Sequence, residues 1–145
     1  MKLNGTHKFK AASAQVFNAM LNPEVLKSCI PGCESVEYLT ANQMQVSMTT
    51  PLPGLKGPFG IPITITQCQE PDFLEFQVQR QGAGASVSAT GKITLIDEPD
   101  GALLVYDANA QLTGAAAIAN NPFGARTIKG SLHFFFKNLD AAIAK

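Results

Sequence analysis

The sequence predicts an α+β fold in which a curved, seven-stranded antiparallel sheet wraps around one long C-terminal helix, with two short helices between the first and second strands. Apolar residues alternate with polar ones in seven segments, which is typical of strands that bury one face. The connections between consecutive strands are too short for parallel crossovers. From Ile128 onward the apolar residues follow helical spacing instead. The length of 145 residues suits one globular unit, so we expect a single domain over residues 1–145.

The N-terminal part is predicted to hold one strand and both short helices. Residues 2–10 alternate between a mostly apolar face and a polar face. Ser13 is the predicted N-cap of a helix that reaches Leu21. Pro23 suits the first turn of a second helix, which ends near Cys29.

The alternation of apolar and polar residues also predicts the other six strands, and helical spacing predicts the last helix. A turn at Glu98-Pro99-Asp100-Gly101 joins the last two strands, and the final helix is expected to begin between Ala119 and Arg126. The six alternating segments are marked by Val36 to Leu39; Met44, Val46 and Met48; Ile61, Ile63 and Ile65; Leu74, Phe76 and Val78; Val87, Ala89, Gly91, Ile93 and Leu95; and Leu104, Tyr106, Ala108, Ala110 and Leu112.

Composition excludes several classes of function. Eleven Lys+Arg balance eleven Asp+Glu, so the chain has no basic excess with which to bind nucleic acid. Its apolar runs are far shorter than the roughly 20 residues of a membrane-spanning helix. The N-terminus lacks the apolar segment of a secretory signal, so a cytoplasmic setting is expected. An odd total of three cysteines favours reduced thiols, and we expect no metal site.

Small residues stand at several inward positions of the predicted sheet, where a filled sheet would carry Val, Ile or Leu. Two interpretations remain open. The aromatic side of the last helix fills the space with Phe135 and Phe136, or the space is a ligand cavity of roughly 300 Å³ or more. The small residues are Gly5, Ala89, Gly91, Ala108 and Ala110.

The connection at residues 50–60 is too long and too apolar for a tight hairpin turn. It contains three prolines, three glycines and the large apolar residues Leu52, Leu55 and Phe59. Such side chains either plug the end of the core or form a gate that opens for a ligand and touches a membrane or a partner. The sequence is compatible with both.

No catalytic motif is present. The sequence lacks a Gly-x-Ser-x-Gly elbow, a phosphate-binding loop and a His-Glu-x-x-His zinc motif. His7 is expected on the apolar face of the first strand and His133 on the last helix, both in structural roles. Asp107 falls on the polar face of its strand, so we expect it to orient neither histidine.

Asn22-Pro23-Glu24, Leu26 and Cys29-Ile30-Pro31-Gly32-Cys33 resemble the Asp-Pro-Glu and Ile-Pro-Gly-Cys signature of the CoxG family, named for the G subunit of carbon monoxide dehydrogenase. Further similarity covers essentially the whole chain: Gly57 with Phe59, the glycine-spaced residues 82–91, and Gly114 with the closing Phe134-Phe135-Phe136. That family is part of the START/SRPBCC (Bet v 1-like) superfamily. The resemblance implies its helix-grip fold, the same order of elements as the alternation predicts.

The resemblance also implies a function. It points to a non-catalytic accessory protein of a carbon monoxide dehydrogenase-type molybdenum hydroxylase, without a tightly bound cofactor. The implied ligand is apolar, such as a respiratory quinone or a lipid, and the implied location is the cytoplasm, with peripheral contact at the inner face of the membrane. Because this chain ends at Lys145, we expect any membrane contact to come from the domain surface.

The small-residue interior and the resemblance together predict a cavity between the concave face of the sheet and the last helix. Two alternatives stay open: a cyclase- or hydratase-type enzyme, for which Tyr106 and His7 are the titratable candidates, and a pure interaction subunit with a filled core. The predicted lining residues are Val46, Met48, Ile63, Phe76, Val78, Ala89, Gly91, Tyr106, Ala108, Leu132, Phe135 and Phe136.

Overall fold

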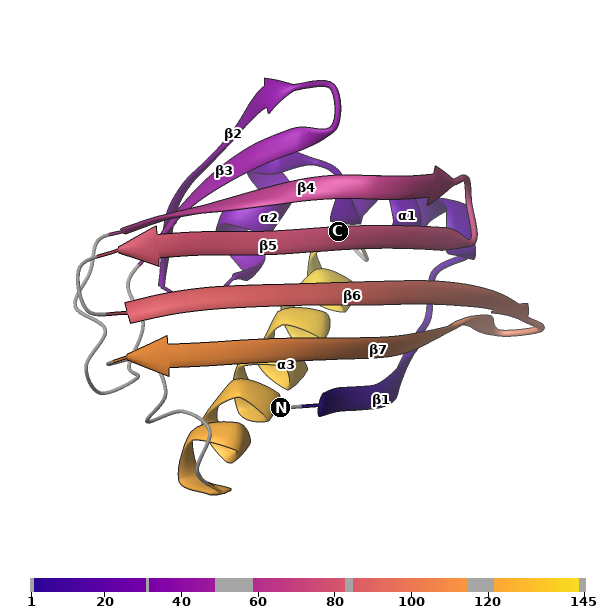
Figure 1. Ribbon diagram of the computed structural model, residues 1–145. Coiled ribbons are helices and arrows are strands. Elements are labelled where there is room, and N and C mark those ends of the chain that lie inside the picture. Colours follow the sequence, from indigo (N-terminus) through magenta and orange to yellow (C-terminus); the bar gives the residue numbers. More distant parts are fainter. Residues whose placement is uncertain (1, 31, 49–58, 83–84, 115–121, 144–145) are drawn as a thin grey trace.

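The computed structural model describes residues 2–30, 32–48, 59–82, 85–114 and 122–143 (Figure 1). Their order of elements confirms the predicted α+β fold, including the start of the last helix at Pro122. The elements are β1 (Lys2–Phe9), α1 (Ser13–Met20), α2 (Pro23–Cys29), β2 (Cys33–Thr40), β3 (Gln43–Met48), β4 (Phe59–Gln69), β5 (Phe73–Gly82), β6 (Ala85–Glu98), β7 (Gly101–Gly114) and α3 (Pro122–Ile143).

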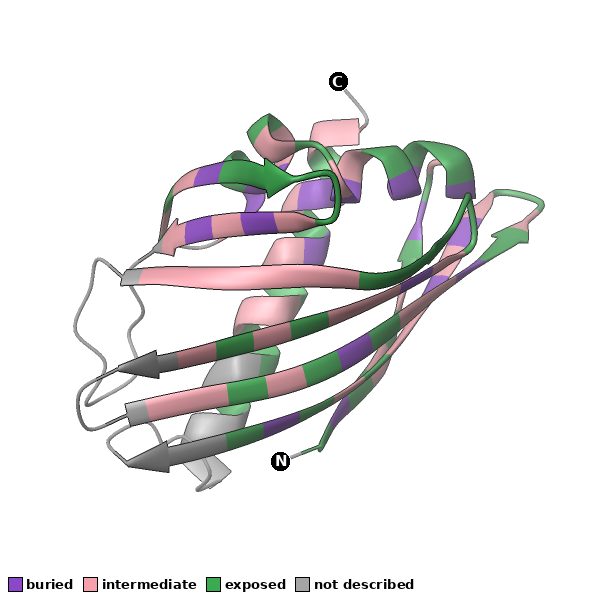
Figure 2. Ribbon diagram, turned by 45° about the horizontal axis from the view of Figure 1, so that its top comes forward, coloured by how far each residue is buried: buried purple, intermediate pink, exposed green. Residues whose placement is uncertain are grey.

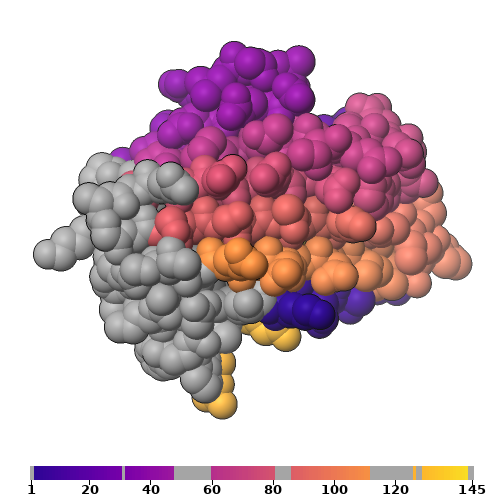
Figure 3. All heavy atoms as spheres, in the orientation of Figure 1, coloured from indigo at the N-terminus to yellow at the C-terminus, as the bar shows by residue number. Residues whose placement is uncertain are grey.

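The seven strands form one antiparallel sheet in the order β1-β7-β6-β5-β4-β3-β2. Figure 1 shows α3 crossing behind the sheet, on its inner face. Figure 3, in the same orientation, shows the outer face of the sheet, which points away from α3. The edge strands curve toward the helices, since β1 contacts α3 and β2 contacts α2. The sheet therefore grips the C-terminal helix, as predicted.

The main core lies at one end of the sheet, where α1 and the C-terminal part of α3 meet it (Figure 2). Burying these apolar side chains is the dominant stabilising term, about 25 cal/mol per Å² of apolar surface. Asn138 ties α3 to α2, because its Nδ2 donates a hydrogen bond to the Cys29 carbonyl at 3.2 Å. The core residues are Phe9, Val16, Phe17, Met20, Cys29, Leu74, Leu95, Leu104, Phe136 and Leu139.

The start of α1 corrects one prediction. Ala12, not Ser13, is the N-cap residue, and it makes no side-chain capping bond. The Ser13 backbone N–H is instead accepted by Oδ1 of Asp97 at 3.1 Å. A carboxylate near the end of β6 thus satisfies one of the free N–H donors in the first turn of α1.

The boundary of β4 corrects a second prediction. Phe59 is the first residue of β4 and pairs with Met48 of β3, so it belongs to the sheet and not to the preceding loop. Leu52 and Leu55 lie outside the described residues.

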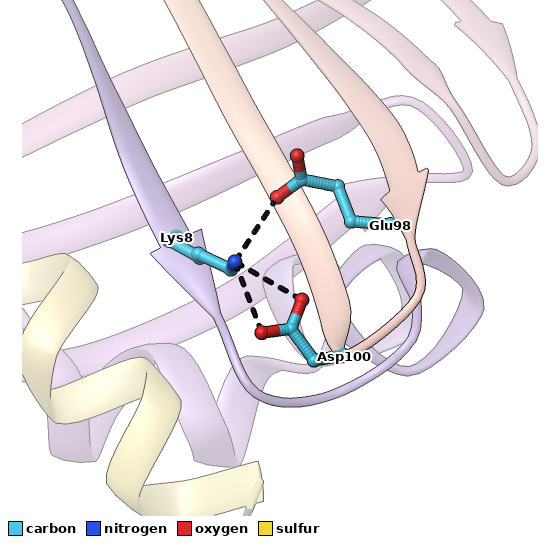
Figure 4. A network of polar contacts seen from close by, with 3 residues as sticks. All are labelled: Lys8, Glu98 and Asp100. Carbon is cyan, nitrogen blue, oxygen red and sulfur yellow. Dashed lines mark hydrogen bonds and ion pairs between the residues drawn. The ribbon is translucent and has the colours of Figure 1, made fainter.

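The β6–β7 turn is fitted closely to the end of β1. Gly101 has φ +154°, and a Cβ at this position would overlap the carbonyl oxygen of Phe9, so only glycine fits. Nearby, Lys8 Nζ lies 3.0 Å from Asp100 Oδ1 and 3.6 Å from Glu98 Oε1 (Figure 4). Lys8 and Asp100 are solvent-exposed and Glu98 is partly exposed, so these ion pairs contribute little to stability.

Candidate ligand-binding site between the sheet and α3

The inner face of the sheet differs between its two ends. Leu74, Leu95 and Leu104 are only 6%, 3% and 0% exposed, because the main core covers them. Ala110, farther along β7 on this face, is also buried. Other apolar side chains on the same face of β4 to β7 stay partly exposed. They are Ile61, Ile63, Phe76, Val78, Ala89, Tyr106 and Ala108. The helix therefore covers one end of the concave face closely and leaves apolar surface at the other.

Aromatic rings mark the boundary between these two regions. Phe136, 4% exposed, is the central ring. Its centroid lies 5.4 Å from those of Tyr106 and Phe135 and 5.6 Å from that of His7. These separations are typical of favourable aromatic pairs. Phe135 and Leu132 are only partly buried on the same helix.

Two glycines of the inner face are covered by neighbouring rings. A Cβ at Gly91 would lie 2.5 Å from Cζ of Phe76, its cross-strand partner. A Cβ at Gly5 would lie 2.7 Å from the hydroxyl oxygen of its partner Tyr106. The rings of Tyr106 and Phe76 occupy the space expected above Gly5 and Gly91, so side chains of the sheet itself take this space.

His7 lies among these rings, 4.8 Å from Phe9 and 6.2 Å from His133 between centroids. Burial lowers the pKa of His7 below 6.5; the negative charge of Asp140 opposes this shift and His133 adds to it. The lowered pKa favours a neutral imidazole at pH 7. Asp107 is exposed on the outer face, as its alternation predicts.

The predicted lining residues fall into several environments. Val46 is 2% exposed and packs with Leu26, Val36 and Met44 in a second core cluster, so it is core instead of lining. Phe136 belongs to the main core, and Gly91 is buried under the Phe76 ring. The side chains of Met48 and Phe59 lie outside the described part of the structure. The remaining predicted residues are partly buried on the inner face or on α3: Ile63, Phe76, Val78, Ala89, Tyr106, Ala108, Leu132 and Phe135.

One inward residue was missed from the sequence. Arg80 continues the inward series of β5 beyond Phe76 and Val78, is partly buried, and donates from Nε to the Gly60 carbonyl at 3.0 Å. Alternation alone predicts this inward position, but the apolar signal of the strand ends at Val78.

Neither metal nor thiolate chemistry finds support among the described residues. They contain no group of three His, Cys, Asp or Glu side chains able to hold a metal ion. Cys29 is buried and Cys68 exposed, while burial raises the pKa of the partly buried Cys33 and disfavours its thiolate. Within the same described segments, no helix has the length and apolar character needed to cross a bilayer.

Known structures share this architecture. A conserved protein from Geobacillus kaustophilus superposes with a TM-score of 0.84 at 26% identity, covering 99% of this chain and 95% of the other. Ara h 8.0201 gives a TM-score of 0.75 at 13% identity, with 99% and 97% coverage. The di-domain ARO/CYC protein StfQ from the steffimycin biosynthetic pathway gives 0.72 at 13% identity, covering 97% of this chain and 50% of that protein.

These similarities confirm the Bet v 1-like, helix-grip fold. No curated protein matches the sequence significantly. The sequence model of the carbon monoxide dehydrogenase G subunit (CoxG) matches residues 5–144. Because this match spans nearly the entire chain, the protein belongs to the CoxG family.

Proposed function

We propose that this protein binds an apolar small molecule, quinone-like or lipid-like, between the concave face of the sheet and α3. It does so as a non-catalytic accessory of a carbon monoxide dehydrogenase-type molybdenum hydroxylase, to which it carries quinone or which it helps to associate with the membrane. The family and the fold support this proposal at the level of an enzyme-associated protein that binds hydrophobic ligands.

The observation that carries the proposal is the partial exposure of one end of the inner face. Ile63, Val78 and Ala89 lie on the same face as the fully covered Leu74 and Leu95, yet they stay accessible. Apolar surface that is exposed inside a concave fold is the usual lining of a site for an apolar ligand. A bound ligand would cover the apolar side chains that α3 leaves accessible.

A quinone titration tests this proposal directly. The chain has no tryptophan and two tyrosines, Tyr38 on β2 and Tyr106 on the inner face. In a Tyr38→Phe background, Tyr106 is the single tyrosine fluorophore, and we expect a short-chain menaquinone to quench it saturably.

A pair of variants on β6 separates cavity binding from surface binding. Ala89→Phe places a ring in the proposed site, whereas Ser88→Phe adds the same ring to the exposed outer face. The new ring would compete with the quinone for space, and a cost of about 1–3 kcal/mol corresponds to quinone binding that is roughly 5- to 150-fold weaker in Ala89→Phe. Equal binding by both folded variants would reject the site.

The StfQ fold similarity keeps a cyclase-type enzyme as the second candidate. Tyr106 is the inward hydroxyl that such chemistry would use. Turnover of a bound substrate that is abolished in Tyr106→Phe would establish the enzyme, whereas release of an unaltered ligand from both proteins supports carriage.

A further inference from the structure

The sheet opens between β4 and β5 at the end away from the main core. Among the described residues, the β4–β5 ladder ends at the pair Ile63 and Val78. β4 nevertheless continues to pair with β3 as far as Phe59, and β5 with β6 as far as Gly82. Figure 2 shows β4 and β5 diverging toward these ends.

Arg80 bridges this opening. Its Nε–H donates to the carbonyl oxygen of Gly60 at 3.0 Å, joining the two strands beyond the last ladder pair. Among the described residues that point inward from β4 to β7, two are charged: Arg80 and Asp97. Asp97 lies at the other end of the sheet, where its side chain accepts a hydrogen bond from the first turn of α1. Arg80 is therefore the cation of the inner face at the opening.

The outer side of the same opening holds a depression of about 380 Å³. Its lining side chains are uncharged, and all of them except Pro62 offer hydrogen-bond donors and acceptors. They are Gln43, Pro62, Thr64, Gln77 and Gln79, from β3, β4 and β5. Figure 3 shows the outer face of these strands. The opening thus has apolar side chains inside, a guanidinium at its rim and neutral polar groups outside.

We propose that the polar head of the bound ligand lies at Arg80 in this opening, with its apolar body along Ile63, Val78 and Ala89. A guanidinium carries N–H donors and no acceptor, so it selects a head group that presents oxygen acceptors and disfavours a cationic one. Charge-assisted hydrogen bonds are the stronger kind, so a carboxylate head binds more tightly than a neutral one. This inference rests on the proposed apolar site and names the class of ligand that it takes.

Paired probes that differ only in the head group test the inference. We use cis-parinaric acid, a fluorescent C18 fatty acid, and its methyl ester in titrations at pH 8. The wild type should bind the acid roughly tenfold more tightly than the ester, a difference of about 1.4 kcal/mol, since hydrogen bonds to charged groups are the stronger kind. Arg80→Gln should bring the acid to the affinity of the ester and leave ester binding unchanged.

Two further variants serve as controls. Arg80→Lys keeps the charge without the planar fork and should retain part of the preference for the acid. Lys92→Gln removes a positive charge from the exposed outer face of β6 and should retain all of it. Equal binding of acid and ester by the wild type, or a preference that survives in Arg80→Gln, would overturn the role of Arg80 while leaving the apolar site intact. If neither probe binds the wild type, the proposed function fails as well.

Discussion

Phe76 covers Gly91 with the end of its ring. The ring occupies space that a larger residue at position 91 would need. Tyr106 covers Gly5 in the same way. Small residues on the inner face of a sheet are therefore not sufficient evidence of a cavity, because a ring on the neighbouring strand can occupy the space above them.

Gly91→Ala tests this arrangement. The new Cβ would meet the Phe76 ring at 2.5 Å and push it away from the sheet, into the proposed site. We expect a loss of about 1 kcal/mol in the free energy of unfolding and weaker quinone binding. Chemical denaturation and the quinone titration measure the two effects. Gly91→Ala with Phe76→Leu should recover the binding.

The control for this substitution is Gly130→Ala on α3, where a Cβ meets nothing within 4 Å. Alanine is the better helix former by about 1 kcal/mol, so this variant should be more stable than the wild type. A Gly91→Ala protein that is as stable and binds as tightly as the wild type would contradict the packing described for Phe76.

His7 gives a pH dependence whose sign follows from its surroundings. Its pKa in the folded protein lies below 6.5, mainly through burial. Between that lowered pKa and 6.5, the unfolded chain binds more protons than the folded protein does. The free energy of unfolding therefore falls as the pH drops below 6.5. Denaturation at several pH values should show this loss in the wild type and a smaller one in His7→Gln.

NMR titration of the two histidines provides a direct reading, with His133→Gln used to assign the signals. A His7 resonance that titrates at or above pH 6.5 in the folded protein would refute the burial of this imidazole among the rings.

At the scale of elements, α1 depends on a residue far away in the sequence. The side chain and the backbone N–H of Ser13 lower the pKa of Asp97, which holds the first turn of the helix from β6. The stabilisation is present above pH 3.8 and is lost as the pH falls through the lowered pKa. Asp97→Ala should lower the free energy of unfolding at pH 7, and the difference from the wild type should shrink at acidic pH.

Asp100→Ala is the matched control, since it removes an exposed carboxylate from the neighbouring turn, where it contacts Lys8 (Figure 4). We expect almost no change in stability from this variant, because exposed ion pairs contribute little. Equal effects of the two alanine substitutions would mean that Asp97 has no special role at α1.

Most of the fold could be predicted because each strand carries its own period-two signal. The inward series of β7, from Leu104 to Ala110, and the outward position of Asp107 follow from alternation alone. Pro23 likewise begins α2 as local chemistry suggests. These features depend on residues that are neighbours in the chain.

The features that sequence reasoning missed depend on distant residues. Asp97 serves the start of α1 across 84 positions, and nothing near Ser13 indicates it. The place where β4 leaves β5 depends on how the two strands twist, and no residue type marks Ile63 as the last paired position. Which inward residues are buried depends on which distant elements cover them. Val46 is core because it packs in one cluster with Leu26 of α2 and Val36 of β2.

For the whole molecule, membrane contact through Leu52, Leu55 and Phe59 remains a prediction. With a formal net charge of zero, the protein has no general attraction to anionic lipid. We therefore expect weak, reversible co-sedimentation with vesicles that is insensitive to phosphatidylserine content and is lost in Leu52→Ser/Leu55→Ser/Phe59→Ser. Equal sedimentation of the folded variant and the wild type would exclude this segment as the contact.

The central claim is that the space between the sheet and α3 holds an apolar molecule. The most direct measurement is solvent extraction and mass spectrometry of the protein purified from its native host, alongside Ala89→Phe and Ser88→Phe. We predict a quinone or lipid in near-equal amounts with the wild type and Ser88→Phe, and strong depletion in Ala89→Phe. A wild-type protein that carries no apolar molecule, or an Ala89→Phe protein that carries as much as the wild type, would contradict the account.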